Sequence, residues 1–300
     1  MSIRIDNITR GRFGNKILQY NSLVQIANNL YLEPSCAQWE GHLFFKNLVG
    51  YKPNDKPIKK LTWKDVLHKT DNELKEIAKN YTLNIDDPSY LLHNVFFKVT
   101  KKDPREILEL KDKFKVKLSS EFIHIGIHIR GGDIRGSDGN QGREIHPTSY
   151  YIHAIQEIES ELKCNKIYYI CTDDKTFETF IELVGYLEQN NIPSKLGPNT
   201  YNNTTLKQAN NSYINDFALL TECDIIISSS STFALTAAFI GKKNKKLIFY
   251  KKWLERNVAH EKWGKISNNY PEEYWYSYDN FWIDISNGGN DYLNIWKIVD

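Results

Sequence analysis

The segment that most constrains the fold is 122–133, FIHIGIHIRGGD, in which a short apolar strand runs directly into a glycine turn. Isoleucine recurs at every second position over Ile123–Ile129 and faces one side, while His128 and Arg130 face the other. A strand this apolar is typical of the centre of a sheet. Polar residues at its carboxyl end lie where open α/β sheets bind ligands. The segment therefore predicts a ligand site, and its arginine favours an anion.

Short apolar strands and helices alternate after residue 116. Expected strands lie at 122–130, 166–174, 224–230 and 245–253, and expected helices at 149–162, 175–188, 216–223 and 232–240. Strands joined by helices of this length predict a parallel sheet with right-handed crossovers, so this half is expected to be Rossmann-like. The polar segment 193–213, rich in Asn and Thr, is expected to be a surface loop with little structure.

The amino-terminal part of the chain has a weaker pattern. A short strand is predicted over 2–9, followed by the glycine turn 11–15 and a helix whose apolar stripe runs over Ile17–Leu30. From about 33 to 115 the pattern is irregular, with one helix predicted over 71–80.

The carboxyl-terminal tail, 253–296, is unusually aromatic. We expect its rings to pack back across two lobes, with stacking on sugars as the alternative. The expected division is a lobe at 1–115, a second lobe at 116–250, and the tail at 251–300.

Length and charge exclude several classes of protein. A chain of 300 residues with 41% hydrophobic content is long enough for two lobes. A net charge of +2, from 39 basic and 37 acidic side chains, gives no field that favours nucleic acid or a membrane surface. No apolar run approaches the roughly 18 residues of a membrane helix, and the chain start has no leader-like apolar region, so we expect a cytoplasmic protein.

Cysteine and histidine spacing predicts no metal site. The eight histidines form no HExxH pattern or other close ligand cluster, so we expect no metal and no other cofactor. The four cysteines lack the paired spacings of zinc or redox sites and are expected to be reduced, buried thiols: Cys36, Cys164, Cys171 and Cys223.

Two turns have the chemistry of a phosphate site. Arg130 has five fixed donors, and the glycines that follow let the backbone approach an anion, with a salt bridge to Asp133 as the alternative. The segment SSSSTF, 228–233, places small hydroxyl residues at a helix start, where free amides and the helix dipole favour a diphosphate. The alternative for this segment is an ordinary N-cap by Ser230 or Ser231.

Carboxylates lie at the start of the helix predicted over 216–223 and at the end of the strand predicted over 166–174. Asp216 could accept hydrogen bonds from the ring N–H and exocyclic amine of guanine, or could simply cap a helix. Asp173 and Asp174 could bond ribose hydroxyls, orient arginines, or cap a helix that begins at Lys175. The glycines of the turn 11–15 are a weak signal when taken alone.

Taken in order, five segments resemble the motif set of the α1,2-, α1,6- and protein O-fucosyltransferase superfamily: GRFGNKILQY, HIRGGD, CTDD, DFALLTECD and SSSSTFALTAAFIG. The closest resemblance is to the α1,2-fucosyltransferases of glycosyltransferase family 11. The resemblance implies an α/β, GT-B-like fold of two Rossmann-like lobes, with the nucleotide-sugar site in the cleft and the first lobe on the acceptor side. It also implies metal-independent, inverting transfer of L-fucose from GDP-fucose to a glycan hydroxyl, with an α1,2 linkage to galactose expected.

The resemblance also implies roles for individual residues. His128 would approach the guanine nucleotide, Arg130 the β-phosphate and Asp216 the guanine, while Asp174 would support the donor site. The diphosphate pocket would be lined by Ser231, Thr232 and Phe233.

One departure concerns the arginine turn. Many relatives read HxRRGD, whereas this chain has Gly131 in place of the second arginine. We expect Arg12 to replace that charge, and Arg12 and Asn15 to face the same cleft. The residue that removes the proton of the acceptor hydroxyl is expected among three carboxylates that follow the turn: Asp133, Asp138 and Glu144. Asp133 could instead only brace Arg130.

Three alternatives stay open. The chain could transfer another GDP-linked sugar or fucosylate another position, could be a protein O-fucosyltransferase, or could bind a GDP-sugar without catalysis.

Overall fold

The computed structural model describes residues 1–8, 12–53, 56–86, 102–132, 146–201, 213–229, 231–242, 246–250 and 294–299. Within them the chain divides into two compact units, one over Met1–Lys111 and one that begins at Asp112. None of the helices in the described ranges is both long and apolar enough to span a membrane. The aromatic tail, 253–296, lies outside the described residues except for its last three positions.

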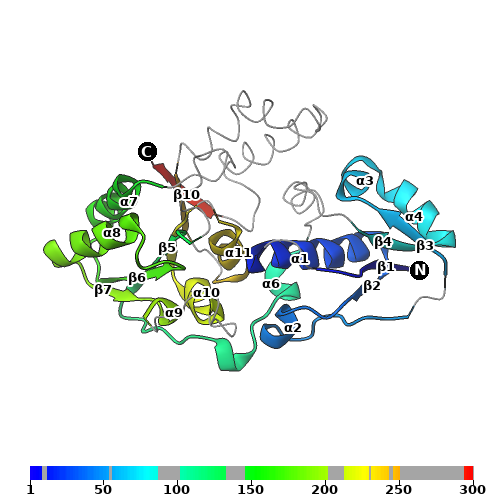
Figure 1. Cartoon of the computed structure of the whole chain (residues 1–300), viewed down its shortest axis with the longest axis horizontal. Helices are drawn as coiled ribbons and strands as arrows, with labels where there is room; N and C mark the ends of the chain where they lie inside the picture. Colours follow the sequence, from blue (N-terminus) through cyan, green and yellow to red (C-terminus); the bar gives the residue numbers. More distant parts are fainter. Residues whose placement is uncertain are drawn as a thin grey trace. The chain divides into compact units, whose positions relative to one another are not determined.

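The first unit is built on a four-stranded parallel sheet with the strand order β2-β1-β4-β3 (Figure 1). Its described elements are β1 Ser2–Ile5, α1 Phe13–Leu30, β2 Glu33–Cys36, α2 Gly41–Phe44, β3 Ile58–Leu61, α3 Trp63–His68, α4 Asp71–Asn80, β4 Thr82–Ile85 and α6 Pro104–Ile107. The predicted strand, the long helix and the helix over 71–80 are all present.

The prediction of an irregular region from 33 to 115 was wrong, because this region contributes β2, β3 and β4. Each of these strands has only four residues, too few to establish a period of two. Pro34 and the lysine pair of β3 further conceal the pattern. The helices nearby are marked more clearly, since Thr62 and Thr70 each form a capping box at a helix start.

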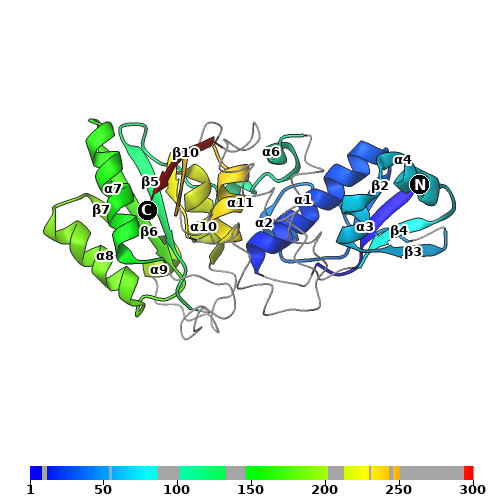
Figure 2. The same ribbon diagram turned by 90° about the horizontal axis from the view of Figure 1, so that it is seen from above.

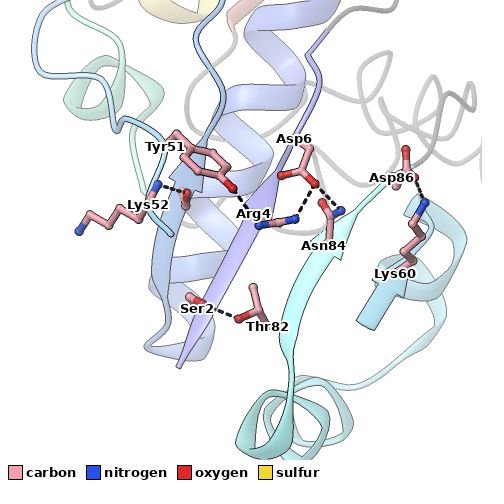
Figure 3. A network of polar contacts seen from close by, with 10 residues as sticks. Ser2, Arg4, Asp6, Tyr51, Lys52, Lys60, Thr82, Asn84 and Asp86 are labelled. Atoms are coloured by element: carbon pink, nitrogen blue, oxygen red, sulfur yellow. Dashed lines mark hydrogen bonds and ion pairs between the residues drawn. The ribbon is translucent and has the colours of Figure 1, made fainter. Parts of the chain in front are cut away.

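One face of this sheet is polar, and Figure 3 shows its hydrogen bonds. Arg4 is 6% exposed and donates to Asp6 Oδ2 at 2.7 Å. Asn84, its register partner on β4, donates to the same oxygen at 2.9 Å. The opposite face carries Ile3 and Leu83, both buried. Because the Asp6 side chain is 40% exposed, this ion pair is expected to add little stability.

The second unit contains a six-stranded parallel sheet with the order β10-β9-β8-β5-β6-β7. Its described elements are η1 Asp112–Phe114, β5 Ile123–Ile129, α7 Thr148–Glu161, β6 Lys166–Thr172, α8 Glu178–Gln189, β7 Ser194–Leu196, α9 Pro198–Tyr201, α10 Tyr213–Glu222, β8 Ile225–Ile227, α11 Thr232–Ile240, β9 Lys246–Tyr250 and β10 Asn294–Val299. The chain order of these strands is that of a Rossmann fold.

Strand β5 lies inside the sheet, between β8 and β6, and both of its faces are buried. Helices α7 and α8 pack together on one side of the sheet, and α10 and α11 pack together on the other (Figures 1 and 2). Ile125, Ile127 and Ile129 join the core that α7 and α8 cover. On the other face Gly126 lets α10 approach, since an added Cβ would lie 2.5 Å from Leu220 Cδ2.

Several sequence predictions in this unit were wrong in detail. The segment 193–213 is not wholly a loop, because Ser194–Leu196 forms β7 against β6 and α9 follows it. A strand of three residues is too short to show a pattern. Helix α8 begins at Glu178 rather than at Lys175, because Asp174 forms a turn of its own first. Strand β10 was not predicted.

The cysteine prediction holds for three of the four thiols. Cys36, Cys171 and Cys223 are buried, whereas Cys164 is exposed. Cys164 follows the end of α7, in the polar connection to β6, where no apolar layer covers it.

Candidate functional site

The topology of the second unit places a crevice at the carboxyl ends of β5 and β8. Strand β5 leads through α7 to β6 on one side, whereas β8 leads through α11 to β9 on the other side. Connections that leave two neighbouring strands in opposite directions separate the loops above them, and this switch point is where open α/β sheets bind ligands. The polar turns predicted from the sequence at 128–133 and 228–233 follow these two strands.

His128 joins the two strand ends. Its Nδ1 lies 2.6 Å from Ser229 Oγ, and its backbone oxygen accepts from Ser229 N–H at 3.2 Å. Its ring stacks on Phe233, with centroids 5.2 Å apart and planes 29° apart. Phe217 of α10 meets the same phenyl ring edge-on at 5.1 Å. His128 and Phe233 therefore form a fixed aromatic pair at the switch point.

Helix α11 begins at this pair. Ser231 is its N-cap and accepts from Phe233 N–H at 3.2 Å. This serine is therefore an ordinary helix cap, which was the alternative considered for it. The remaining first-turn amides, those of Thr232 and Ala234, lie at the positive end of the helix dipole. Ser230 lies outside the described residues.

The arginine turn after β5 is held by a carboxylate from the next strand. Asp173 Oδ1 accepts from Gly131 N–H at 2.8 Å and from Gly132 N–H at 3.0 Å. The sequence offered three roles for Asp173, and the structure adds a fourth, since its carboxylate binds the amides of the turn directly. Arg130 itself is half-buried.

Gly131 fits a position with little room for a side chain. An added Cβ would lie 3.0 Å from Phe177 Cβ and 3.1 Å from Asp174 Cβ. The packing around this position therefore favours glycine over the second arginine of HxRRGD, because an arginine here would require Phe177 to move.

Asp174 shapes the turn that leads into α8. Its Oδ1 accepts from Thr176 N–H at 2.9 Å and from Thr176 Oγ1 at 2.7 Å. This is an Asx-type turn rather than the helix cap that was one of the alternatives for Asp174. The carboxylate nevertheless lies at the carboxyl edge of the sheet, as predicted.

Asp216 lies in the first turn of α10 and is 4% exposed. Its Oδ1 accepts from Asn199 N–H at 2.7 Å, and its Oδ2 accepts from Thr200 Oγ1 at 3.2 Å. Burial raises the pKa of Asp216 to about 6, against the opposing effect of these hydrogen bonds. Thr200 was missed by the sequence analysis, because it lies in the segment expected to be an unstructured loop.

His146 is a second residue that the sequence did not indicate. It is 3% exposed, and its ring meets Tyr150 edge-on at 5.3 Å. Burial, with a smaller effect from His128, lowers its pKa to about 3. His146 is therefore a neutral imidazole behind the switch point.

The first unit contains the two remaining predicted site residues. Arg12 is the exposed N-cap residue of α1, and Asn15 lies in the first turn of that helix. Among the described residues, the buried Asn15 Oδ1 has no hydrogen-bond partner. Phe13 anchors the helix start, since its ring stacks on Phe45 at 6.0 Å and meets Phe44 edge-on. That Arg12 and Asn15 of the first unit share a site with Arg130 of the second unit stays a prediction.

Some predicted features fall beyond what the structure describes. The base candidates Asp133, Asp138 and Glu144 lie in 133–145, outside the described residues. Within the described ranges, no three His, Cys, Asp or Glu side chains gather in a way that could hold a metal ion.

The chain resembles known proteins both in its sequence profile and in its fold. The sequence profile of glycosyl transferase family 11 matches residues 5–277. No curated protein sequence matches the chain. A point mutant of FUT1 from Arabidopsis thaliana, in complex with GDP, is 13% identical with a TM-score of 0.52, over 80% of this chain and 68% of that one.

POFUT1 in complex with GDP-fucose is 10% identical with a TM-score of 0.50, over 82% of this chain and 96% of that one. The fucosyltransferase NodZ from Bradyrhizobium is 13% identical with a TM-score of 0.46, over 80% and 93%. At such low identity, the likeness of this chain to the FUT1 and POFUT1 structures shows a common fold. With the two parallel sheets, they confirm the predicted α/β, GT-B-like architecture.

Proposed function

Because the chain belongs to glycosyl transferase family 11, whose profile spans residues 5–277, we propose that it transfers L-fucose from GDP-fucose to a glycan hydroxyl. The two solved structures that share its fold were determined with GDP and with GDP-fucose. The single observation that carries the proposal is the switch point between β5 and β8, where His128, Ser229 and Phe233 are already joined.

The diphosphate fits the second unit through two sources of positive charge. Arg130 follows β5, and the first turn of α11 follows β8, so both lie at the carboxyl ends of neighbouring strands. A guanidinium binds phosphate oxygens in a fork, and the helix amides add a partial positive charge. Ser231, Thr232 and Phe233 would contact the diphosphate from this helix start.

Guanine recognition is assigned to Asp216 with support from His128. An ionised carboxylate accepts two hydrogen bonds side by side, which matches the ring N–H and exocyclic amine of guanine. Adenine lacks that donor pair, so the same carboxylate would discriminate against it. Asp174 would support the donor from the end of β6.

The reaction breaks the bond between the anomeric carbon and a phosphate oxygen. Negative charge develops on the departing GDP, and fixed donors aimed at it lower the barrier. Arg130, the α11 amides and Arg12 from the first unit would supply this stabilisation without a metal ion. A carboxylate that removes the proton of the acceptor hydroxyl would complete a single displacement with inversion. The candidates for this base are Asp133, Asp138 and Glu144.

The acceptor is proposed from family membership alone. An α1,2 linkage to galactose in an oligosaccharide fits family 11, and the first unit would supply the acceptor side. Asn15 of this unit would face the donor, and its buried Oδ1, which has no hydrogen-bond partner among the described residues, would accept from a hydroxyl of the donor sugar.

Isothermal titration of EDTA-treated protein with GDP, ADP and UDP tests the donor assignment. We expect selective GDP binding, followed by slow GDP release from GDP-fucose and faster release when galactose-terminated oligosaccharides are added. Loss of binding to all three nucleotides would remove the proposal. GDP binding without any turnover would instead favour a GDP-sugar-binding protein without catalysis.

A further inference from the structure

We propose that Thr200 is a positioning residue that holds the Asp216 carboxylate for guanine and so determines base selectivity. The inference rests on the proposed function, because it concerns the same nucleotide site. Thr200 is 2% exposed and lies in α9, which follows β7 at the carboxyl edge of the sheet. It connects Asp216 on α10 to Thr172 at the end of β6.

The Thr200 hydroxyl has two acceptors and one proton. Its Oγ1 accepts from Thr172 N–H at 2.9 Å, and it lies 3.3 Å from Thr172 O and 3.2 Å from Asp216 Oδ2. Since a hydroxyl donates one proton, it bonds either to the carbonyl or to the carboxylate at a given moment. Rotation about one bond exchanges the two arrangements without moving any heavy atom.

This exchange gives Asp216 one fixed oxygen and one exchangeable oxygen. Oδ1 is held by Asn199 N–H at 2.7 Å, which fixes the plane of the carboxylate. When a base N–H reaches Oδ2, the Thr200 proton turns to Thr172 O, and no buried donor loses its partner. The site thereby avoids the penalty that an unpaired buried hydroxyl would add to binding.

Close packing keeps the β7–α9 segment and the carboxylate in one arrangement. A Cβ added at Gly197 would lie 2.7 Å from Asp216 Oδ1 and 2.7 Å from Cys171 Sγ. Gly197 N–H also donates to Ile170 O of β6 at 2.8 Å. The segment therefore cannot shift without moving Asp216, so Thr200 acts on a carboxylate that is otherwise confined.

The test measures GDP and IDP binding by isothermal titration to Thr200→Val and Thr200→Ser. Hypoxanthine in IDP lacks the exocyclic amine of guanine, so the ratio of the two affinities reports on the second hydrogen bond to Asp216. Valine keeps the shape of threonine without the hydroxyl, so Oδ2 is no longer held, before the base binds, in the orientation that the exocyclic amine needs. We therefore expect the preference for GDP to fall about tenfold. Serine keeps the hydroxyl and should keep the ratio. Thr221→Val is the matched control, because this buried hydroxyl on α10 donates to Ala218 O at 2.7 Å.

Each outcome has one meaning. Failure of the native chain to bind GDP overturns the proposed function and this inference with it. A native preference for GDP that Thr200→Val retains within twofold overturns the inference alone. A ratio that Thr200→Ser also loses assigns the effect to packing and overturns the role of the hydroxyl. If the valine variant does not fold, Thr200→Ala carries the same expectation, and the serine variant still separates hydroxyl from packing.

Discussion

Replacing Asp173 with alanine is expected to loosen the arginine turn and weaken GDP binding without removing any group that the ligand contacts. Asp173 Oδ1 accepts from the amides of Gly131 and Gly132, which are 42 and 41 residues away in the chain. The carboxylate therefore fixes the backbone that presents Arg130. Its loss leaves two amides of the turn without their partner.

The magnitude follows from the two hydrogen bonds. A hydrogen bond to a charged group contributes about 1.5 to 3 kcal/mol, and two bonds to one oxygen are not fully additive. We therefore expect Asp173→Ala to lower the free energy of unfolding of the second unit by about 2 to 4 kcal/mol. That corresponds to a fall in melting temperature of roughly 5 to 15 °C for a unit of this size.

Chemical denaturation followed by circular dichroism gives the stability, and titration with GDP gives the affinity. Asp173→Asn keeps an oxygen acceptor and should lose about half as much stability. Asp112→Ala is the matched control, because this carboxylate is 77% exposed and forms an ion pair with Lys115, three residues further along the chain. The reasoning is refuted if Asp173→Ala binds GDP as the native chain does and unfolds within about 0.5 kcal/mol of it.

Three further predictions concern the same site. The raised pKa of Asp216 means that the folded chain holds this proton more tightly than the unfolded chain, so the stability that it contributes is complete below pH 3.8 and is lost as the pH rises through about 6. Asp216→Asn should remove this dependence in melting curves and add roughly 1 to 3 kcal/mol at pH 8, while abolishing the preference for GDP over ADP. Arg130→Ala should lower kcat for GDP release from GDP-fucose by about 10²- to 10³-fold with little change in melting temperature. Gly131→Arg, which restores HxRRGD, should lower stability by about 1 to 3 kcal/mol through contact with Phe177, and the same substitution should cost less when it is made in a Phe177→Ala chain. Equal melting temperatures for native and Gly131→Arg chains would contradict this.

The sequence predicted elements well where local chemistry alone decides them. The helix over 71–80 has the predicted bounds because Thr70 and Glu73 form a capping box at its start. Helix α11 also has its predicted bounds, since Ser231 caps its start. Strand β5 combines a run of isoleucines with a following glycine turn, so both its type and its central place were predicted.

Elements that depend on distant partners were missed. Strand β7 has three residues, and only its pairing with β6 makes it a strand. Strand β10 pairs with β9 across more than 40 residues of sequence, which no local pattern records. The same reason hid Thr200, whose role depends on Thr172 and Asp216 rather than on its neighbours in the chain.

Several polar residues of the site share one property that their sequence motifs do not reveal, which is that they already hydrogen-bond to other groups of the protein. His128 contacts Ser229, Asp173 holds the glycine turn, and Asp216 holds Asn199 and Thr200. A nucleotide that enters such a site must exchange hydrogen bonds rather than fill unpaired ones. Exchange adds little affinity for a correct base, but it penalises a base that lacks a donor, because the displaced bond is then not replaced. Selectivity at this switch point should therefore depend more on residues such as Thr200, which can turn to a second partner, than on the number of polar groups that face the ligand.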